Sequence, residues 1–438
     1  MMKPKLILLA VLLAAGNWAQ AADLLETLHA AQANDPVFAA ARAAQQAGQE
    51  KLPQGRSLLL PSVNLSANTT YNKQDATYQG FLSAASGNYN YNSNGYGVTL
   101  KQPLFNQQNW QAYSESELQA AQADIQLKIA EQDLIVRVAQ VYFDVLIAQD
   151  SVQLVEAQKM AISEQLEQAK RNFEVGSATI TDTLEAQARY DQTGAQQIAV
   201  QNNLEIKRSA LQQLINAVPQ DLKPLGKELK LETPQPADIE KWVETAQLNN
   251  LQLGIARANA EIADKEVARS RGGHYPTVDL VANYSTNNTG GVLSNETTSK
   301  SVGVQLNVPL FQGGVVNSRA REAAANYERA RQDLESARRN VAQQTRQAYL
   351  GVVSGIAQVQ ALQQALASSD SVLAASKLGH EVGVRTNLDV LNAQQQLYAT
   401  RRDLYQAQYN YLISQLQLKA AAGSLSEEDL GKENQALY

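Results

Sequence analysis

Imidazole is the side chain that most often binds metals and transfers protons near neutral pH. The chain has only three histidines, His29, His274 and His380, which lie in separate segments with no H-x-x-x-H pair. It also has no cysteine, no nucleophile elbow of the G-x-S-x-G type and no glycine loop of the kind that binds phosphate. The sequence therefore predicts no catalytic site, no metal site and no cofactor.

Two acidic residues stand in a pattern with a local structural role. Thr179-x-x-Asp182 and Thr386-x-x-Asp389 each place a carboxylate three residues after a threonine. This is the spacing of a capping box, in which the two side chains satisfy backbone N–H groups at the start of a helix. Each motif therefore predicts a helix that begins directly after its threonine.

The positions of these motifs reveal an internal duplication. Residues Phe173 to Gln187 align with His380 to Gln394 at an offset of 207, and eight of the fifteen positions are identical. Upstream, Pro103-Leu104-Phe105 matches Pro309-Leu310-Phe311 at an offset of 206. The two halves of the chain thus share one order of elements.

Each half has a pair of amphipathic strands. Apolar and polar residues alternate from Ser62 to Tyr71 in the first half and from Val278 to Tyr284 in the second. After a loop rich in Gly, Ser and Asn, a partner run follows near Val98 and near Val304. A period of two predicts strands with one apolar face. The hairpins reach the length of about 9 to 11 residues that a tilted transmembrane strand needs.

Long helices follow the hairpins. In each half more than sixty residues without proline separate the hairpin from the next Val-Gly-x-x-Thr motif. At 1.5 Å per residue each helix could reach roughly 100 Å. Apolar positions fall near a heptad seam in the second half: Val341, Ala348, Val352, Val359, Leu366 and Leu373. Small flanking Ala and Gln residues favour neighbours on both sides, so we expect a wall of coiled-coil helices.

The N-terminus has the order of a secretory signal peptide. Lys3 and Lys5 precede an apolar stretch, and Ala19-Gln20-Ala21 fits a cleavage site, so we expect cleavage near Ala21 and export. The formal net charge of −6 argues against nucleic acid as a partner.

Taken together, these motifs resemble the TolC family of outer-membrane channels. Asn34-Asp35-Pro36 lies early in the first helix, and the two Val-Gly-x-x-Thr turns join long helices. The run from Tyr409 to Lys419, with the segment from Gly423 to Leu430, is similar to the end of the family's chains. The match covers essentially the whole mature chain and includes the repeat order.

The resemblance implies a mixed α and β membrane protein. Four strands cannot close a barrel alone, and in the family a homotrimer forms a 12-stranded transmembrane β-barrel that a long periplasmic α-helical barrel continues. It implies a place in the outer membrane, in contact with outer-membrane lipid. The implied partners are a periplasmic adaptor (membrane fusion) protein and an inner-membrane RND, MFS or ABC pump. The expected function is the exit duct of tripartite multidrug efflux and type I protein secretion systems.

The two repeats follow one plan along the chain. The expected segments, in order, are the signal peptide 1–21, the first repeat 22–217 with its hairpin at about 60–104 and tip turn at 174–180, the equatorial linker 218–237, the second repeat 238–422 with its hairpin at about 275–310 and tip turn at 381–387, and the C-terminal equatorial tail 423–438.

The resemblance also implies a pore constriction near the tips. The family narrows its entrance with two acidic positions, which correspond to Asp389 and Asn392. Because the second position is an amide here, the entrance should carry fewer charges, three from Asp389 in a trimer. Asp389 thus has two interpretations, a ring of carboxylates in the pore and a helix cap.

Two further roles follow from the resemblance. The family's closed-state latch maps onto Asp182 and Arg385, with Thr181 and His380 beside them. An ordinary surface residue remains the alternative for His380. The tip turns that dock the adaptor correspond to Val175, Gly176, Ser177, Val382, Gly383 and Val384.

Three other classes of protein fit the sequence less well. An enzyme would need catalytic groups that this sequence does not contain. A passive outer-membrane porin needs many strands per chain, whereas most of this chain is predicted helix. A trimeric surface adhesin would place its barrel in one terminal segment.

Overall fold

The computed structural model describes residues 23–218, 221–226, 229–290, 295–435 and 437. The predicted signal peptide lies outside these residues. The chain divides into two compact units, and each draws on both repeats. The strand-bearing unit comprises Ala44–Gln126 and Gly254–Ser336, and the helical unit comprises Met1–Ala43, Leu127–Leu253 and Ala337–Tyr438. Among the described residues, no helix is both long and apolar enough to cross a membrane.

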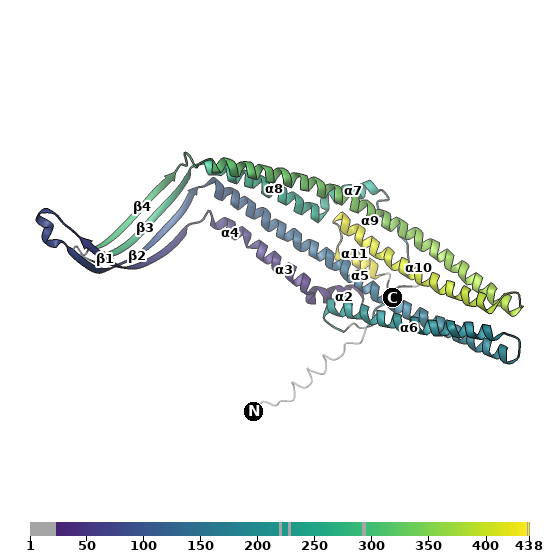
Figure 1. The fold of residues 1–438 in the computed structure, drawn as a ribbon. Helices are drawn as coiled ribbons and strands as arrows, with labels where there is room; N and C mark the ends of the chain where they lie inside the picture. Colours follow the sequence, from purple (N-terminus) through teal and green to yellow (C-terminus); the bar gives the residue numbers. More distant parts are fainter. Residues whose placement is uncertain (1–22, 219–220, 227–228, 291–294, 436, 438) are drawn as a thin grey trace, which may run out of the picture. The chain divides into compact units, whose positions relative to one another are not determined.

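The strand-bearing unit contains one antiparallel sheet in the order β1-β2-β3-β4 (Figure 1). Its strands are β1 (Ser62–Ala76), β2 (Gly87–Phe105), β3 (Thr277–Thr289) and β4 (Asn295–Asn307), and the short 3₁₀ helix η1 (Gly80–Ala85) joins the first two. The register pairs Leu65 with Val98 and Val98 with Tyr284, so apolar residues from successive strands share one face. The alternation in the sequence therefore does mark strands with an apolar and a polar face.

The two repeats meet in the middle of this sheet, because β2 of the first pairs with β3 of the second. Within the part of the chain that the structure describes, the outer strands β1 and β4 have no neighbour on their free sides. These two edges present unpaired backbone N–H and C=O groups.

Helices of the strand-bearing unit approach one another closely. They are α4 (Lys51–Ser57), parts of α3 (Pro36–Gln49), α5 (Gln107–Glu174), α8 (Leu251–Arg271) and α9 (Val315–Glu381), and the 3₁₀ helix η2 (Gly272–His274). At Gly55 an added Cβ would lie 2.0 Å from Ser116 Oγ, so only glycine permits this contact between α4 and α5. Close approach of this kind suits helices that lie side by side along their length.

The helical unit holds the main hydrophobic core. It contains the remaining parts of α3, α5, α8 and α9 with α2 (Leu24–Asn34), α6 (Ile180–Ile215), α7 (Ile239–Asn249), α10 (Asn387–Ala422) and α11 (Glu427–Asn434). Tyr142, Phe143 and Tyr409 are buried at its centre, and the rings of Phe143 and Tyr409 lie 5.7 Å apart. The predicted heptad seam on α9 is confirmed at Val341, Val352, Val359 and Leu373, which are all buried.

Segments that interrupt the helical pattern pack on this core. Asn216 ends α6 and Gly423 ends α10, both in the left-handed conformation that closes helices. The hydroxyl of Tyr411 accepts a hydrogen bond from the Glu232 N–H at 2.8 Å and donates to the Glu232 carbonyl at 3.0 Å. On α11, Asp429 pairs with Lys419 of α10 at 2.5 Å. The C-terminal helix is therefore held by both apolar and ionic contacts.

Glu433 on α11 makes this packing sensitive to pH. Burial raises its pKa from an ordinary 4.5 to about 7, Lys419 lowers the pKa in part, and Glu232 and Asp429 raise it further. The folded state therefore holds the proton more tightly than the unfolded chain does. The resulting stabilisation is complete below pH 4.5 and is lost as the pH rises through about 7.

The Glu433→Gln variant should remove this pH dependence, because its side chain stays neutral. Relative to the parent, its stability should rise by on the order of 3 kcal/mol between pH 4.5 and 7 and then stay level. Thermal unfolding of both proteins across this range measures the difference. A difference that did not change with pH would mean that Glu433 is not protonated in the folded protein.

Candidate functional site at the helix hairpin tips

The candidate site lies where α5 turns into α6 and α9 turns into α10. Both turns lie at the same end of the helical unit (Figure 1). Gly176 and Gly383 have φ angles of 77° and 78°, the left-handed region that favours glycine. The Ser177 N–H donates to Asn172 O at 2.8 Å, and the Val384 N–H donates to Gly379 O at 2.9 Å. Both helices therefore end in the same six-to-one Schellman closure.

The N-cap threonine of the next helix lies three residues after each glycine, and each N-cap forms a complete capping box. The Asp182 carboxylate accepts from the Thr179 N–H at 2.9 Å, and Asp182 N–H donates to Thr179 Oγ1 at 3.3 Å. The matching distances at Thr386 and Asp389 are 2.9 and 3.2 Å. The local structure of both tips thus follows directly from the repeated motif.

Contacts between the two hairpins come from residues of α6 and α10. Asn387 Nδ2 donates to the Asp182 carbonyl oxygen at 3.4 Å, and Arg189 Nη2 donates to Asn392 Oδ1 at 3.1 Å. Below them, Leu391 of α10 packs in a small buried cluster with Leu166 and Ala186 of α5 and α6. The hairpins are joined at the tip by polar contacts and deeper by apolar ones.

Three of the four predicted latch residues lie around one cavity. Asp182, His380 and Arg385 line a cavity of about 280 Å³ between the hairpins, whereas Thr181 is exposed outside its lining. Among the described residues, no ion pair within 4.0 Å joins Asp182 to Arg385. The carboxylate of Asp182 serves its own helix cap instead.

Arg385 is held by its own hairpin. His380 Nδ1 lies 3.3 Å from the Arg385 carbonyl oxygen. A Cβ on Gly379 would lie 2.6 Å from Arg385 Cγ, so the arginine stem occupies the space that glycine leaves. Its guanidinium contributes to the low pKa of Asp389. Arg385 therefore lies four positions before Asp389, and its positive charge favours the ionised form of that carboxylate.

Asp389 and Asn392 occupy successive turns of α10. Hydrogen bonds from the Thr386 backbone and side chain hold the pKa of Asp389 below its ordinary value, with a smaller contribution from Arg385. The carboxylate therefore stays ionised at neutral pH. Asn392 accepts from Arg189, which brings a positive charge to the second position of the predicted constriction.

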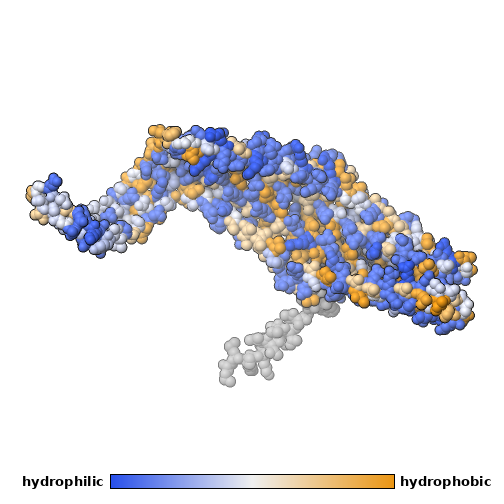
Figure 2. Space-filling view, viewed as in Figure 1, coloured by the Kyte–Doolittle hydropathy of each residue, from blue (hydrophilic) through white to orange (hydrophobic). Residues whose placement is uncertain are grey.

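The tip turns expose apolar side chains. Val175, Val382 and Val384 are 77%, 65% and 78% exposed. Figure 2 shows hydrophobic side chains at this end of the helical unit among hydrophilic ones. The capped turns at this end of the helical unit therefore present exposed valines to solvent.

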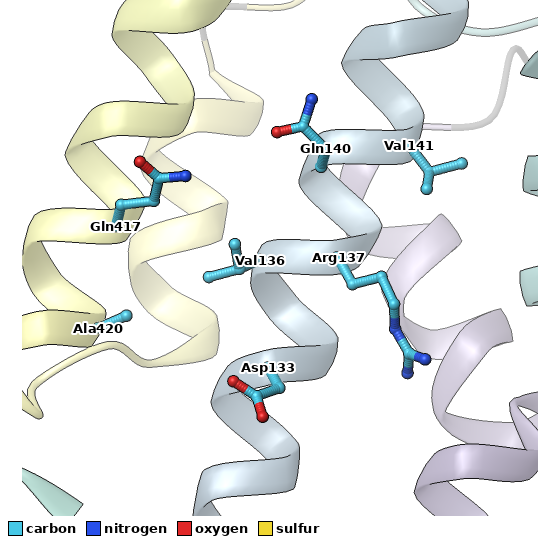
Figure 3. Close-up of a pocket in the computed structure, with 7 residues that line it drawn as sticks. All are labelled: Asp133, Val136, Arg137, Gln140, Val141, Gln417 and Ala420. Atoms are coloured by element: carbon cyan, nitrogen blue, oxygen red, sulfur yellow. The ribbon is translucent and has the colours of Figure 1, made fainter. Parts of the chain in front are cut away.

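A second hollow lies on the side of the helical unit. It is a groove of about 380 Å³ between α5 and α10, lined by Asp133, Val136, Arg137, Gln140, Val141, Gln417 and Ala420 (Figure 3). Arg137 turns away from it toward the neighbouring helices, and its guanidinium pairs with Asp35. The groove has few convergent polar groups, so the tips remain the better candidate site.

Sequence reasoning missed three residues of the tip: Arg189, Asn387 and Gly379. None belongs to the repeated motif, because the second repeat has Gln396 where the first has Arg189, and the first has Ile180 where the second has Asn387. These differences between the two repeats were the signal in the sequence that could have pointed to the contact residues.

Comparison with known proteins identifies the family. The model of the outer membrane efflux protein family matches residues 27–217 and 242–424. The chain is 34% identical over 431 residues to outer membrane protein TolC of Escherichia coli, a match that covers 95% of this chain and 85% of that protein. It is 32% identical to the proteases secretion protein PrtF of Dickeya chrysanthemi, covering 98% and 94% of the two chains.

Solved structures show the same fold. The outer membrane protein VceC from Vibrio cholerae superposes with a TM-score of 0.79 at 19% identity, covering 91% of this chain and 96% of that one. The two segments that the family model matches are separated by residues 218–241, which follow α6. The chain therefore belongs to the outer membrane efflux protein family and is a TolC-type channel of the outer membrane, a transport protein and not an enzyme.

Proposed function

We propose that three copies of this chain form one exit duct of a tripartite efflux or type I secretion system. The observation that carries the proposal is the pair of free sheet edges, β1 and β4, in a sheet with an apolar face. Within a bilayer each unpaired backbone group costs several kcal/mol, so the edges must pair with other copies. Three sheets of four strands supply the twelve strands that the family resemblance implies.

Assembly provides the test of this step. The protein purified in detergent should be a trimer by light scattering with the detergent mass subtracted, because only association pairs the β1 and β4 edges. A monodisperse monomer would contradict the architecture.

The partners follow from the family and from the tip surface. A periplasmic adaptor would dock on the tip turns formed by Val175, Gly176, Ser177, Val382, Gly383 and Val384. An inner-membrane RND, MFS or ABC pump would then supply energy and choose the cargo. The name of the relative PrtF, a proteases secretion protein, supports protein export as one use of the duct.

The tip itself is proposed as the gate of the duct. The hairpins meet there through two polar contacts, Asn387 to Asp182 and Arg189 to Asn392. Hydrogen bonds and exposed ion pairs are worth about 0–1.5 kcal/mol each, so an adaptor can break them at low cost. The equatorial segments and the main core lie elsewhere in the helical unit and need not change.

Replacing Arg385 by serine tests the gate. Arg385 lines the cavity between the hairpins and shares it with Asp182 and His380. Its removal should raise the single-channel conductance in planar bilayers, because the closed arrangement loses a cation that faces the first hairpin. Trimer stability should stay nearly constant, since the side chain is exposed.

The control for this experiment is Arg208→Ser. Arg208 is an exposed arginine on α6 that pairs with Glu205 of the same helix. It should leave conductance unchanged. Equal conductance in all three proteins would show that Arg385 is a surface residue without a role in gating.

A further inference from the structure

One lysine stands at the border of the apolar face of the sheet. The register places Leu65, Val98, Tyr284 and Lys300 in one row across the four strands. The next row toward the helices is apolar, with Val63, Leu100, Ala282 and Val302. Beyond Lys300, toward the loops, β4 presents Thr298 and Glu296 on the same face. On β4, Lys300 therefore marks the level at which the apolar residues of this face end.

The charge of Lys300 has no acidic partner in the described part of the chain. Its Nζ lies 5.6 Å from the centre of the Tyr284 ring, and no carboxylate lies within 4.0 Å. Glu296, on the same face of β4, is four residues further along, or about 13 Å at the rise of a strand. By contrast, Lys101 on the opposite face pairs with Asp279 at 3.0 Å.

A groove runs beside this lysine. It has a volume of about 360 Å³ and is lined by Val98, Leu100, Ala282, Asn283, Tyr284, Lys300, Ser301 and Val302. The row order puts the apolar side chains Leu100, Ala282 and Val302 toward the helices and the ammonium group toward the loops. The groove is thus amphipathic along its length.

The location of this face fixes what can fill the groove. In the barrel of the proposed function, on which this inference rests, the apolar face meets the hydrocarbon of the outer membrane, and the strands lead from the helices toward the loops. A lysine on the lipid face of a barrel costs about 2–4 kcal/mol at the middle of the bilayer but only about 0–1 kcal/mol near the interface. Lys300 therefore lies where its stem rests on apolar surface and its ammonium reaches the headgroups.

We propose that this groove binds an anionic, phosphate-bearing lipid of the outer leaflet. The phosphate contacts Lys300, whose ammonium is a compact donor for such oxygens. The acyl chain lies along Leu100, Ala282 and Val302 toward the helices. The ring of Tyr284 supports both parts, because it contacts the cation and lines the groove. The site uses residues of β2, β3 and β4 of one chain.

The full chain in detergent allows a direct measurement. Native mass spectrometry would count bound dioleoyl phosphatidylglycerol and, separately, dioleoyl phosphatidylcholine, which has the same chains but no net charge. For Lys300→Gln the apparent Kd for phosphatidylglycerol should rise about fivefold, the effect of one lysine at an anionic surface. Lys300→Arg should bind like the parent, and phosphatidylcholine binding should not change in any variant.

Lys73→Gln is the matched control, because Lys73 is an exposed lysine on the same face of β1, outside the groove. Equal weakening by Lys73→Gln would overturn the proposal in favour of general surface charge. Displacement of the lipid by inorganic phosphate alone would show a site for a free anion. A loss of thermal stability in lipid-free Lys300→Gln, unchanged by adding phosphatidylglycerol, would show that Lys300 acts through protein contacts and would also overturn it.

Discussion

Replacement of Arg137 by methionine is expected to destabilise the helical unit by about 3 kcal/mol. Arg137 on α5 pairs with Asp35 at 2.5 Å, and the Asp35 side chain is only 4% exposed. Removing one partner of a buried pair leaves an uncompensated charge, which costs about 3–5 kcal/mol, and the partial exposure of Arg137 places the effect at the lower end. Methionine keeps much of the stem volume, so the measured loss reports mainly the charge.

Asp35 also explains why Asn34-Asp35-Pro36 stands between α2 and α3. Its carboxylate accepts from the Phe38 N–H at 2.9 Å, so it caps α3 while it binds α5. The double variant Asp35→Asn/Arg137→Met removes both charges and keeps an amide oxygen for the cap. It should recover most of the lost stability, because neither charge is then left unpaired.

Unfolding in guanidinium chloride, followed by circular dichroism, measures these changes in stability. Arg208→Met is the control, since it breaks an exposed pair within one helix and should leave the midpoint nearly unchanged. If Arg137→Met shifted the midpoint no more than Arg208→Met, the Asp35 pair would contribute no stability.

Replacement of Asp389 by asparagine is expected to abolish block of the channel by trivalent cations and its preference for cations. In a trimer three ionised carboxylates would meet at the constriction, where a wall of low dielectric constant concentrates their field. The low pKa of Asp389, caused by its hydrogen bonds from Thr386, keeps this charge present at neutral pH. Asparagine keeps an oxygen that can accept the same hydrogen bonds.

Thr386→Ala separates the ring from the cap. It removes the hydroxyl that accepts from the Asp389 N–H, so it weakens the cap but keeps the charge. Cation block should survive in Thr386→Ala and be lost in Asp389→Asn, measured in planar bilayers. If block and selectivity were the same in both variants and only thermal stability fell, Asp389 would be a helix cap alone.

The second position of the proposed constriction, Asn392, is expected to behave differently because of Arg189. An aspartate at position 392 would face the guanidinium that now donates to Asn392 at 3.1 Å. Asn392→Asp should therefore strengthen cation block only slightly. The combination with Arg189→Gln frees the new carboxylate and should strengthen block further, since each ion would then meet six charges in a trimer.

The local structure of this protein could be predicted from the order of its residues. The capping boxes at Thr179 and Thr386 and the closures at Gly176 and Gly383 depend on residues within six positions of one another. The strand alternation and the heptad seam on α9 likewise follow from periods of two and about 3.5. The duplication shows each pattern twice, and the family resemblance implies a copy number that the local patterns leave open.

Contacts between residues far apart in the chain could not be predicted in this way. Arg189 and Asn392 are 203 positions apart, and Arg137 and Asp35 are 102 apart. Such contacts depend on how each helix is rotated about its axis and on how the two hairpins pack, and a small rotation moves a side chain to another neighbour. For the same reason Asp182 and Arg385 share a cavity without an ion pair, although they lie in the corresponding tip regions of the two repeats. The burial that shifts the pKa of Glu433 likewise arises from packing of α11 against distant segments.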